Sequence, residues 1–279
     1  MQDGAPARLM RRARLAALLA AAALQPGCAS LPGPGTATTS QGTFDYAVAG
    51  QGSPAVVLEA GLGDGKQTWK PVFAELARTT RVFAYDRAGY GASRSAAKDR
   101  SGRQVVAELH ELLRAAGVAP PYVVVGHSLG GTYAIQFAQA YPGEVAGAVL
   151  IDARPADFGE RCHAAEAFIC EPPRALVSLI GGGAPGEYDA VPETMRQIRA
   201  GPPFPPVPLV VLTGMNKVLE GPTFNRLWRQ TQQELAALSP RGTHVVCEHC
   251  GHYVHKDDPA LAVAAIRDVI SQARNGAGR

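Results

Sequence analysis

The sequence has no long apolar run and no basic patch, and each absence excludes a class of protein. Outside the N-terminus, no uninterrupted apolar stretch approaches the 18 residues expected of a membrane-spanning helix. The lysines and arginines are not clustered with aromatic residues, so we predict no nucleic-acid partner. The 279 residues are 46% hydrophobic and 18% charged, which predicts a globular protein with a sizeable core.

A nucleotide-binding loop is also missing. The glycine-rich stretch "AGLGDGKQT", residues 60–68, follows an apolar run, as a phosphate loop would. However, Ala60 stands where that motif needs its first glycine, and Gln67 stands where it needs serine or threonine. The dinucleotide fingerprint G-x-G-x-x-G fails as well, because Lys66 replaces its last glycine. We therefore predict no nucleotide cofactor.

The first 28 residues have the pattern of an export signal. Four arginines precede "LAALLAAAAL", an apolar run too short to span a bilayer, and a Pro-Gly pair follows it. We expect a protein exported by a bacterium: periplasmic, secreted or lipid-anchored. Cys28 is the candidate for lipid attachment and the one expected membrane contact, although "QPGC" lacks the apolar residue usually found three positions before that cysteine.

Without residues 1–27 the chain has no charge bias. Four arginines and one aspartate leave with this segment, so that the 27 basic and 24 acidic residues become 23 of each. The small excess of positive charge therefore belongs to the expected signal.

Short β-branched runs alternate with helical patterns over residues 44–273, which we expect to be one domain. The runs are continuously apolar, which predicts strands buried on both faces of a mostly parallel, doubly wound α/β sheet. Residues 29–43, before this domain, are rich in proline, glycine, serine and threonine and predict a flexible tether. The expected strands are 55–60, 81–86, 122–127, 146–152, 208–214 and 243–249, and the expected helices are 69–78, 103–116, 129–140, 223–238 and 259–273.

One interval, at about 153–206, interrupts this alternation. It contains many prolines and glycines, the two cysteines Cys162 and Cys170, and no good strand. In a sheet of this kind, an insertion at this position predicts a lid over the ligand crevice.

Ser128 lies in "GHSLGG", residues 126–131, between a predicted strand and a predicted helix. The pattern G-x-S-x-G is typical of a sharp turn that holds a nucleophilic serine in strained backbone. Such a turn also points the first N–H groups of the helix at a developing oxyanion. We expect Ser128 to be a nucleophile, and His127 beside it to pack or to position the turn.

A serine nucleophile needs a general base, and the base needs an orienting acid. The segment "CEHCGHYVH", residues 247–255, offers His252 as the base and His255 as its rival. The same segment has two other interpretations: a thiol-redox pair of Cys247 and Cys250, or a zinc site of these cysteines with histidines. Cys247 lies in a predicted strand rather than at a helix start, and no second ligand pair of matching spacing occurs outside the lid. A structural disulfide or two buried thiols are therefore expected.

Together these motifs resemble the α/β-hydrolase family. The matching pieces are "GHSLGG", "EAGLGDG", "YDRAGYGAS" and "CGHYVH", which cover residues 44–272 apart from the lid. The resemblance implies an α/β-hydrolase sheet with a lid insertion after the sixth strand. It also implies an oxyanion hole made by the backbone N–H groups of Leu62 and Leu129. Asp86 and Arg87, in the third piece, are interpreted as structural residues of a tight loop.

The family resemblance leaves two candidates for the acid. The family most often has an aspartate after the strand at 208–214, but "MNKVLEG" there contains none. The family's other location is the end of the preceding strand, where "LIDA" supplies Asp152. We expect Asp152 to be the acid, with Glu220 as its rival. The order Ser128, Asp152, His252 fits the family.

The sequence thus predicts an exported serine hydrolase that cleaves carboxylic esters of a small-molecule acyl substrate through an acyl-enzyme. We expect no metal and no organic cofactor. One alternative is hydrolysis of an amide, lactone or carbon–carbon bond on the same fold. Another is a non-catalytic thiol- or metal-binding protein that uses Cys247 and Cys250. Disulfides between Cys162 and Cys170 and between Cys247 and Cys250 would be compatible with export.

Overall fold

The computed structural model describes residues 30–167, 170–217 and 220–276. The expected export signal and Cys28 lie outside these residues. From Leu31 onward the chain forms one compact unit. None of the helices within the described ranges combines the length and the apolar character that crossing a membrane requires.

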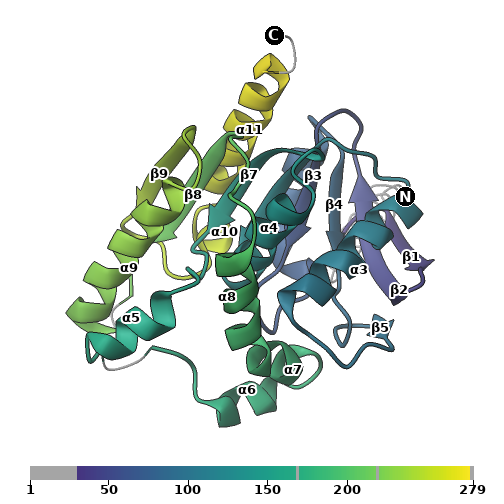
Figure 1. The fold of residues 1–279 in the computed structure, drawn as a ribbon. Helices are drawn as coiled ribbons and strands as arrows, with labels where there is room; N and C mark the ends of the chain where they lie inside the picture. The colour runs from purple at the N-terminus through teal and green to yellow at the C-terminus, as the bar shows by residue number, and fades with distance from the viewer. Residues whose placement is uncertain (1–29, 168–169, 218–219, 277–279) are drawn as a thin grey trace, which may run out of the picture. The chain divides into compact units, whose positions relative to one another are not determined.

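A mostly parallel sheet forms the centre of this unit (Figure 1). Its strand order is β1-β2-β4-β3-β6-β7-β8-β9, and β5 pairs with β2. All pairings from β4 through β9 along this order are parallel, whereas β2 pairs antiparallel with β1, β4 and β5. The strands in the described residues are β1 Pro34–Thr38, β2 Gly42–Ala49, β3 Ala55–Glu59, β4 Val82–Tyr85, β5 Arg94–Ser95, β6 Tyr122–His127, β7 Val145–Ile151, β8 Leu209–Gly214 and β9 Gly242–Cys247.

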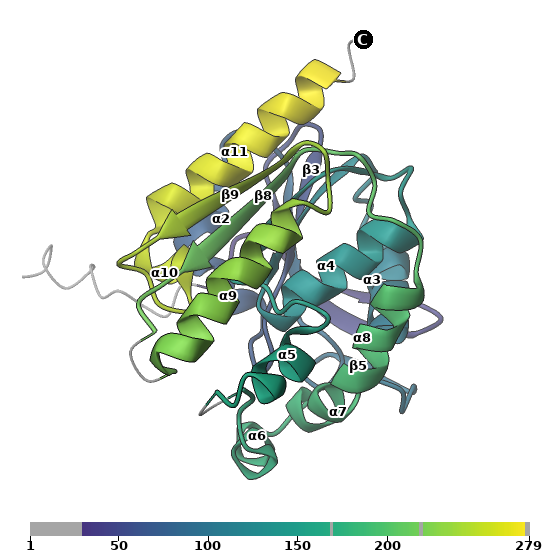
Figure 2. The same cartoon turned by 60° about the vertical axis from the view of Figure 1, so that its left-hand side comes forward.

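Helices cover both faces of the sheet. Figure 2 shows α11 on one side of β8 and β9 and α9 on the other. The hydrophobic core has two parts, one between the sheet and α3 and α4 and one between the sheet and α2 and α11. The doubly wound α/β fold is therefore confirmed. The helices outside the lid are η2 Lys66–Trp69, α2 Lys70–Ala77, α3 Gly102–Ala115, α4 Leu129–Ala140, α9 Gly221–Ala236, α10 Val254–Asp257 and α11 Pro259–Gly276.

The central strands are continuously apolar because both of their faces are covered. All six residues of β6, "YVVVGH", are buried. Helix α4 is buried almost all round, since it packs against β6 on one side and against a lid helix on another. An apolar helix surface of this extent is stable only inside a protein. The junction of β6 and α4 therefore lies between two almost completely buried elements.

The predicted flexible tether at 29–43 is wrong where this segment joins the sheet. Residues 34–38 form β1, an edge strand paired in antiparallel register with β2, and Leu31 is buried in the core. The sequence did not predict this strand because "PGTAT" has five residues and no large apolar side chain. An edge strand pairs with one neighbour only, so it needs little apolar surface. The second strand, β2, was also not predicted, since only two of its eight residues are buried and "GTFDYAVA" lacks the β-branched run of the central strands.

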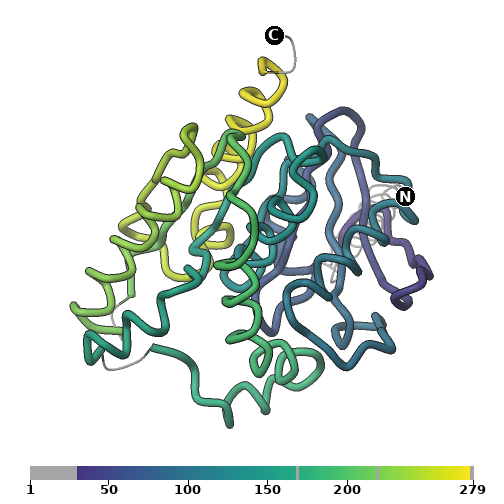
Figure 3. Tube along the Cα trace, viewed as in Figure 1, coloured from purple at the N-terminus to yellow at the C-terminus, as the bar shows by residue number. Residues whose placement is uncertain are grey.

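The segment predicted as a lid joins β7 to β8, and its described residues form four helices. Figure 3 traces this segment in teal and green. Phe158 and Cys162 from its first helix pack on Phe224 and Trp228 of α9. Because the two-residue β5 is counted here, the lid follows the seventh strand in chain order, which is the sixth when β5 is left out. The lid helices are α5 Phe158–Ala164, α6 Arg174–Ile180, α7 Ala184–Asp189 and α8 Val191–Ala200.

Candidate active site

Ser128 occupies a strained turn between β6 and α4. Its φ of 54° and ψ of −121° lie outside the regions that side-chain-bearing residues prefer. The turn can close only because glycines flank it. A Cβ on Gly126 would lie 2.3 Å from the carbonyl oxygen of Gly130, and one on Gly130 would lie 2.3 Å from that of Glu59. This is the geometry that the G-x-S-x-G pattern predicts.

The loop that carries Leu62 lies directly beside the serine. A Cβ on Gly61 would come within 3.4 Å of the Cβ of Ser128. The Leu62 N–H belongs to the same planar peptide as the carbonyl of Gly61, and in a trans peptide these two groups point in opposite directions. That carbonyl accepts a hydrogen bond of 2.8 Å from Arg87 Nη2, so the orientation of the Leu62 N–H is fixed from behind.

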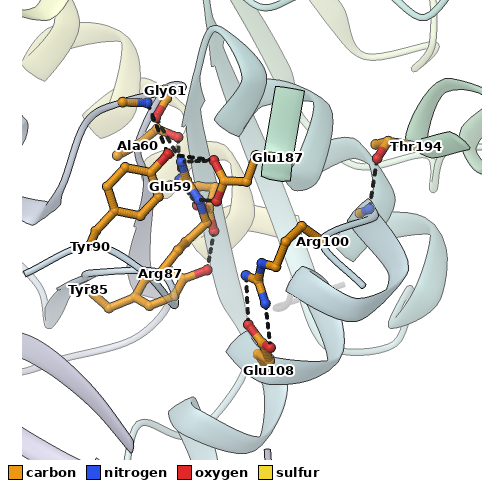
Figure 4. A network of polar contacts seen from close by, with 12 residues as sticks. Glu59, Ala60, Gly61, Tyr85, Arg87, Tyr90, Arg100, Glu108, Glu187 and Thr194 are labelled. Atoms are coloured by element: carbon orange, nitrogen blue, oxygen red, sulfur yellow. Dashed lines mark hydrogen bonds and ion pairs between the residues drawn. The ribbon is translucent and has the colours of Figure 1, made fainter. Parts of the chain in front are cut away.

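Arg87 has a larger role than the turn residue that the sequence predicted. Its guanidinium is buried and uses all five of its N–H donors on the two carbonyls of Ala60 and Gly61 and on the carboxylates of Glu59 and Glu187 (Figure 4). Glu187 comes from lid helix α7. This network therefore joins the Leu62 loop to the lid through one buried cation.

Asp152 and His252 form a close pair. His252 Nδ1 donates to Asp152 Oδ2 at 2.6 Å, and the Asp152 side chain is completely buried. The other carboxylate oxygen accepts hydrogen bonds from Trp228 Nε1 at 2.8 Å and from the Gly214 N–H at 3.2 Å. The carboxylate beside His252 is thus that of Asp152, whereas Glu220 immediately precedes α9 and lines the cavity.

His127 and His255 lie near the site and pack against its residues. His127 Nε2 donates to the carbonyl oxygen of His252 at 2.9 Å, and burial together with the neighbouring His252 and His255 holds its pKa well below the usual value. His255 is buried against Trp69, with 4.5 Å between the ring centres, and burial lowers its pKa to about 3. Both rings are therefore neutral at pH 7 and support the segment that carries His252.

The four cysteines of the described residues form two disulfides. Cys162 is bonded to Cys170 within the lid, and Cys247 is bonded to Cys250 just before His252. The side chains of Cys247, His249, Cys250 and Asp258 place their ligand-type atoms within 4.8 Å of one another. Sulfur atoms bonded to each other are not thiolates, so in this state they do not supply the ligands that a zinc site requires. In this state the segment braces the end of β9.

The chain matches a known family over most of its length. The sequence model of the alpha/beta hydrolase family matches residues 56–266. The chain belongs to the alpha/beta hydrolase family. It is also 30% identical to the protein YqjL of Bacillus subtilis (strain 168) over 220 residues, which are 79% of this chain and 85% of that one.

Solved alpha/beta hydrolase structures share the fold. A thermophilic esterase from Thermogutta terrifontis superimposes with a TM-score of 0.61 and 23% identity, covering 86% of this chain and 98% of its own. The enol-lactonase from Burkholderia xenovorans LB400 has a TM-score of 0.64 and 18% identity, covering 85% and 100%. At these identities the likeness shows the fold alone.

A cavity of about 590 Å³ opens onto the expected catalytic residues of this alpha/beta hydrolase. Ser128 and His252 both line it, as do Leu62 and Leu129. Most of its remaining wall is apolar and comes from the lid and α9: Phe158, Val177, Ile180, Val191, Phe224 and Trp228. The structure therefore brings the predicted nucleophile, base and oxyanion-hole residues to one cavity under the lid.

Three residues of this site were not predicted from the sequence. Lys217 and Trp228 both bind the Asp152 carboxylate, and Glu187 holds Arg87 from the lid. Lys217 left a trace in the sequence, because it stands in the loop where the family most often has an aspartate. Trp228 and Glu187 left none, since a residue's partner across 76 or 100 positions is set by helix packing.

Proposed function

We propose that the protein is an exported serine hydrolase that cleaves carboxylic esters through an acyl-enzyme. The observation that carries this proposal is the 2.6 Å hydrogen bond between His252 and the buried Asp152, at a cavity that Ser128 also lines. A serine on a strained turn, a histidine and a buried carboxylate are the three parts of a serine-hydrolase triad.

In the proposed reaction, Ser128 Oγ attacks the acyl carbon while His252 Nε2 takes its proton. The carbonyl oxygen becomes an oxyanion that the N–H groups of Leu62 and Leu129 stabilise. The C–O bond to the alcohol then breaks, and the alcohol leaves with the proton from His252. A water molecule, deprotonated by the same histidine, cleaves the acyl-enzyme and regenerates Ser128. Asp152 holds the imidazole in the required tautomer throughout.

The size and lining of the cavity favour the proposal that the acyl substrate is small and mainly apolar. Its volume of about 590 Å³ lies in the range of small-molecule sites, and its walls are largely aliphatic and aromatic. Exclusion of water by the lid would strengthen the electrostatic interactions of the triad.

Export is proposed on two grounds. The N-terminal residues have the order of charged, apolar and small residues that signals carry. The two disulfides, Cys162–Cys170 and Cys247–Cys250, suit an oxidising compartment. Mass spectrometry of the bacterial fractions should find a chain that begins near Cys28 outside the cytoplasm; a full-length chain confined to the cytoplasm would contradict this part of the proposal.

Labelling by a fluorophosphonate tests the nucleophile. The protein should be labelled at one serine, and Ser128→Ala should abolish the label, whereas unchanged labelling would refute the assignment. Matched ester, amide and lactone substrates should then show that the ester is cleaved most efficiently. Stoichiometric zinc, with activity lost to a chelator, would contradict the cofactor-free mechanism.

A further inference from the structure

Lys217 is a buried cation that contacts the carboxylate of Asp152. It follows β8, and its side chain is only 4% exposed. Its Nζ lies 2.6 Å from Asp152 Oδ2, the same oxygen that accepts from His252 Nδ1. Because each nitrogen lies 2.6 Å from one shared oxygen, the ammonium and the imidazole are at most about 5.2 Å apart.

The ammonium is held by several contacts rather than by one flexible pair. Its Nζ lies 5.1 Å from the centre of the Trp228 ring, and Trp228 itself donates to the other oxygen of Asp152. The backbone carbonyl of Lys217 accepts from Asn225 Nδ2 at 3.1 Å, which ties the loop to α9. These contacts hold the cation beside the Asp152 carboxylate.

We propose that Lys217 is a positioning residue that balances the charge of Asp152 and so lowers the pH at which His252 begins to act as a base. This inference rests on the proposed function. A buried carboxylate attracts the imidazolium that forms during catalysis. The ammonium of Lys217 opposes that attraction at short range, so the imidazole stays free to accept a proton in more acidic solution.

The other groups near the pair do not supply the same effect. His127 and His255 are buried and neutral, because burial lowers both pKa values. Lys256 is exposed and stacks on Tyr253, 3.8 Å from the ring centre. Arg154, also at the cavity, is bound to Glu171. Glu220, immediately before α9, lines the cavity as well, and so do the tyrosines Tyr188 and Tyr253.

The test measures the rate of fluorophosphonate labelling of Ser128 as a function of pH, which needs no known substrate. Lys217→Met removes the charge and nearly keeps the volume, and Lys217→Gln also keeps an N–H donor for Asp152. Two unit charges about 5 Å apart at an effective dielectric constant of about 20 correspond to roughly two pH units. The acid limb of the labelling profile should therefore move to higher pH by about one to two units in both variants.

Two further variants show whether charge is the cause. Lys217→Arg keeps the cation, so its acid limb should stay near that of the unaltered protein. Lys256→Met removes an exposed cation from the same neighbourhood and should move the limb much less, because solvent screens that charge. If Lys217→Met fails to fold, Lys217→Gln supplies the same comparison.

The outcomes separate this inference from the proposed function. No labelling of the unaltered protein would overturn the proposed function and this inference with it. Normal labelling, with an acid limb that stays in place in Lys217→Met and Lys217→Gln, would overturn the inference alone. Slower labelling at every pH without a shift would show a purely structural lysine and would likewise refute it.

Discussion

Replacing Arg87 by methionine removes the cation that joins the Leu62 loop to the lid. The side chains of Arg87, Glu59 and Glu187 are at most 3% exposed. Arg87 supplies five hydrogen bonds of 2.6–2.9 Å, to the two carboxylates and to the carbonyls of Ala60 and Gly61. Methionine fills part of the space but satisfies none of these acceptors.

The expected loss of stability is large because two buried carboxylates would remain without their cation. Removing one partner of a buried ion pair costs about 3–5 kcal/mol of unfolding free energy. Tyr85 and Tyr90 still donate to Glu59 and Glu187, at 2.7 and 2.8 Å, which keeps the cost within that range. Urea denaturation at pH 7 measures the loss from the unfolding midpoint.

Arg174→Met is the matched control. Arg174 also binds helix α7, through Asp189, but the two side chains are 44% and 58% exposed. An exposed ion pair contributes about 0–1 kcal/mol. If Arg87→Met lowers the unfolding free energy by no more than Arg174→Met does, the buried network does not stabilise the fold more than an exposed ion pair.

A pH signature accompanies the loss. Burial raises the pKa of Glu59 even with Arg87 present, and removal of the cation should raise it further. A carboxyl group whose pKa is higher in the folded state than in the unfolded state favours folding as the pH falls. The deficit of Arg87→Met relative to the unaltered protein should therefore shrink between pH 7 and pH 5, and a deficit independent of pH would contradict this cause.

Three other predictions follow from single contacts. Asp152→Asn should lower the turnover rate about 10⁴-fold although Ser128 is still present, as removal of an orienting acid does. If Glu220→Gln lowers the rate by this much and Asp152→Asn does not, Glu220 is the acid. Replacing Cys162 and Cys170 together by serine should lower the unfolding free energy by about 2–3 kcal/mol, because a closed loop of this length restricts the unfolded chain, and equal urea midpoints would contradict this. His255 has a pKa of about 3 in the folded protein, so the unfolded state binds a proton first and the unfolding free energy falls as the pH drops below 6.5. His255→Gln should remove about 1.4 kcal/mol of this loss per pH unit. Unfolding free energies measured between pH 6.5 and 4 test this.

The elements that the sequence located well are those whose pattern comes from local burial. The strand at 122–127 and the helix at 129–140 match β6 and α4 residue for residue, because both faces of β6 are covered and a turn with glycines separates the two. The edge strand β1 and its neighbour β2 were missed, since both are only partly buried and lack the continuous apolar run of the central strands. The four helices described in the lid were missed as well, because they have at most ten residues and prolines and glycines lie between them.

The sequence by itself determined the central strands of the sheet, the turn at Ser128 and the segment that carries His252, because each depends on a few consecutive residues. Only the tertiary structure decided which carboxylate lies beside His252, and that Lys217 shares its oxygen. It also decided that Arg87 spans from Glu59 to the lid. These contacts join residues 28 to 100 positions apart. The packing of strands and helices determines which of these residues meet, and a local sequence pattern does not contain that information.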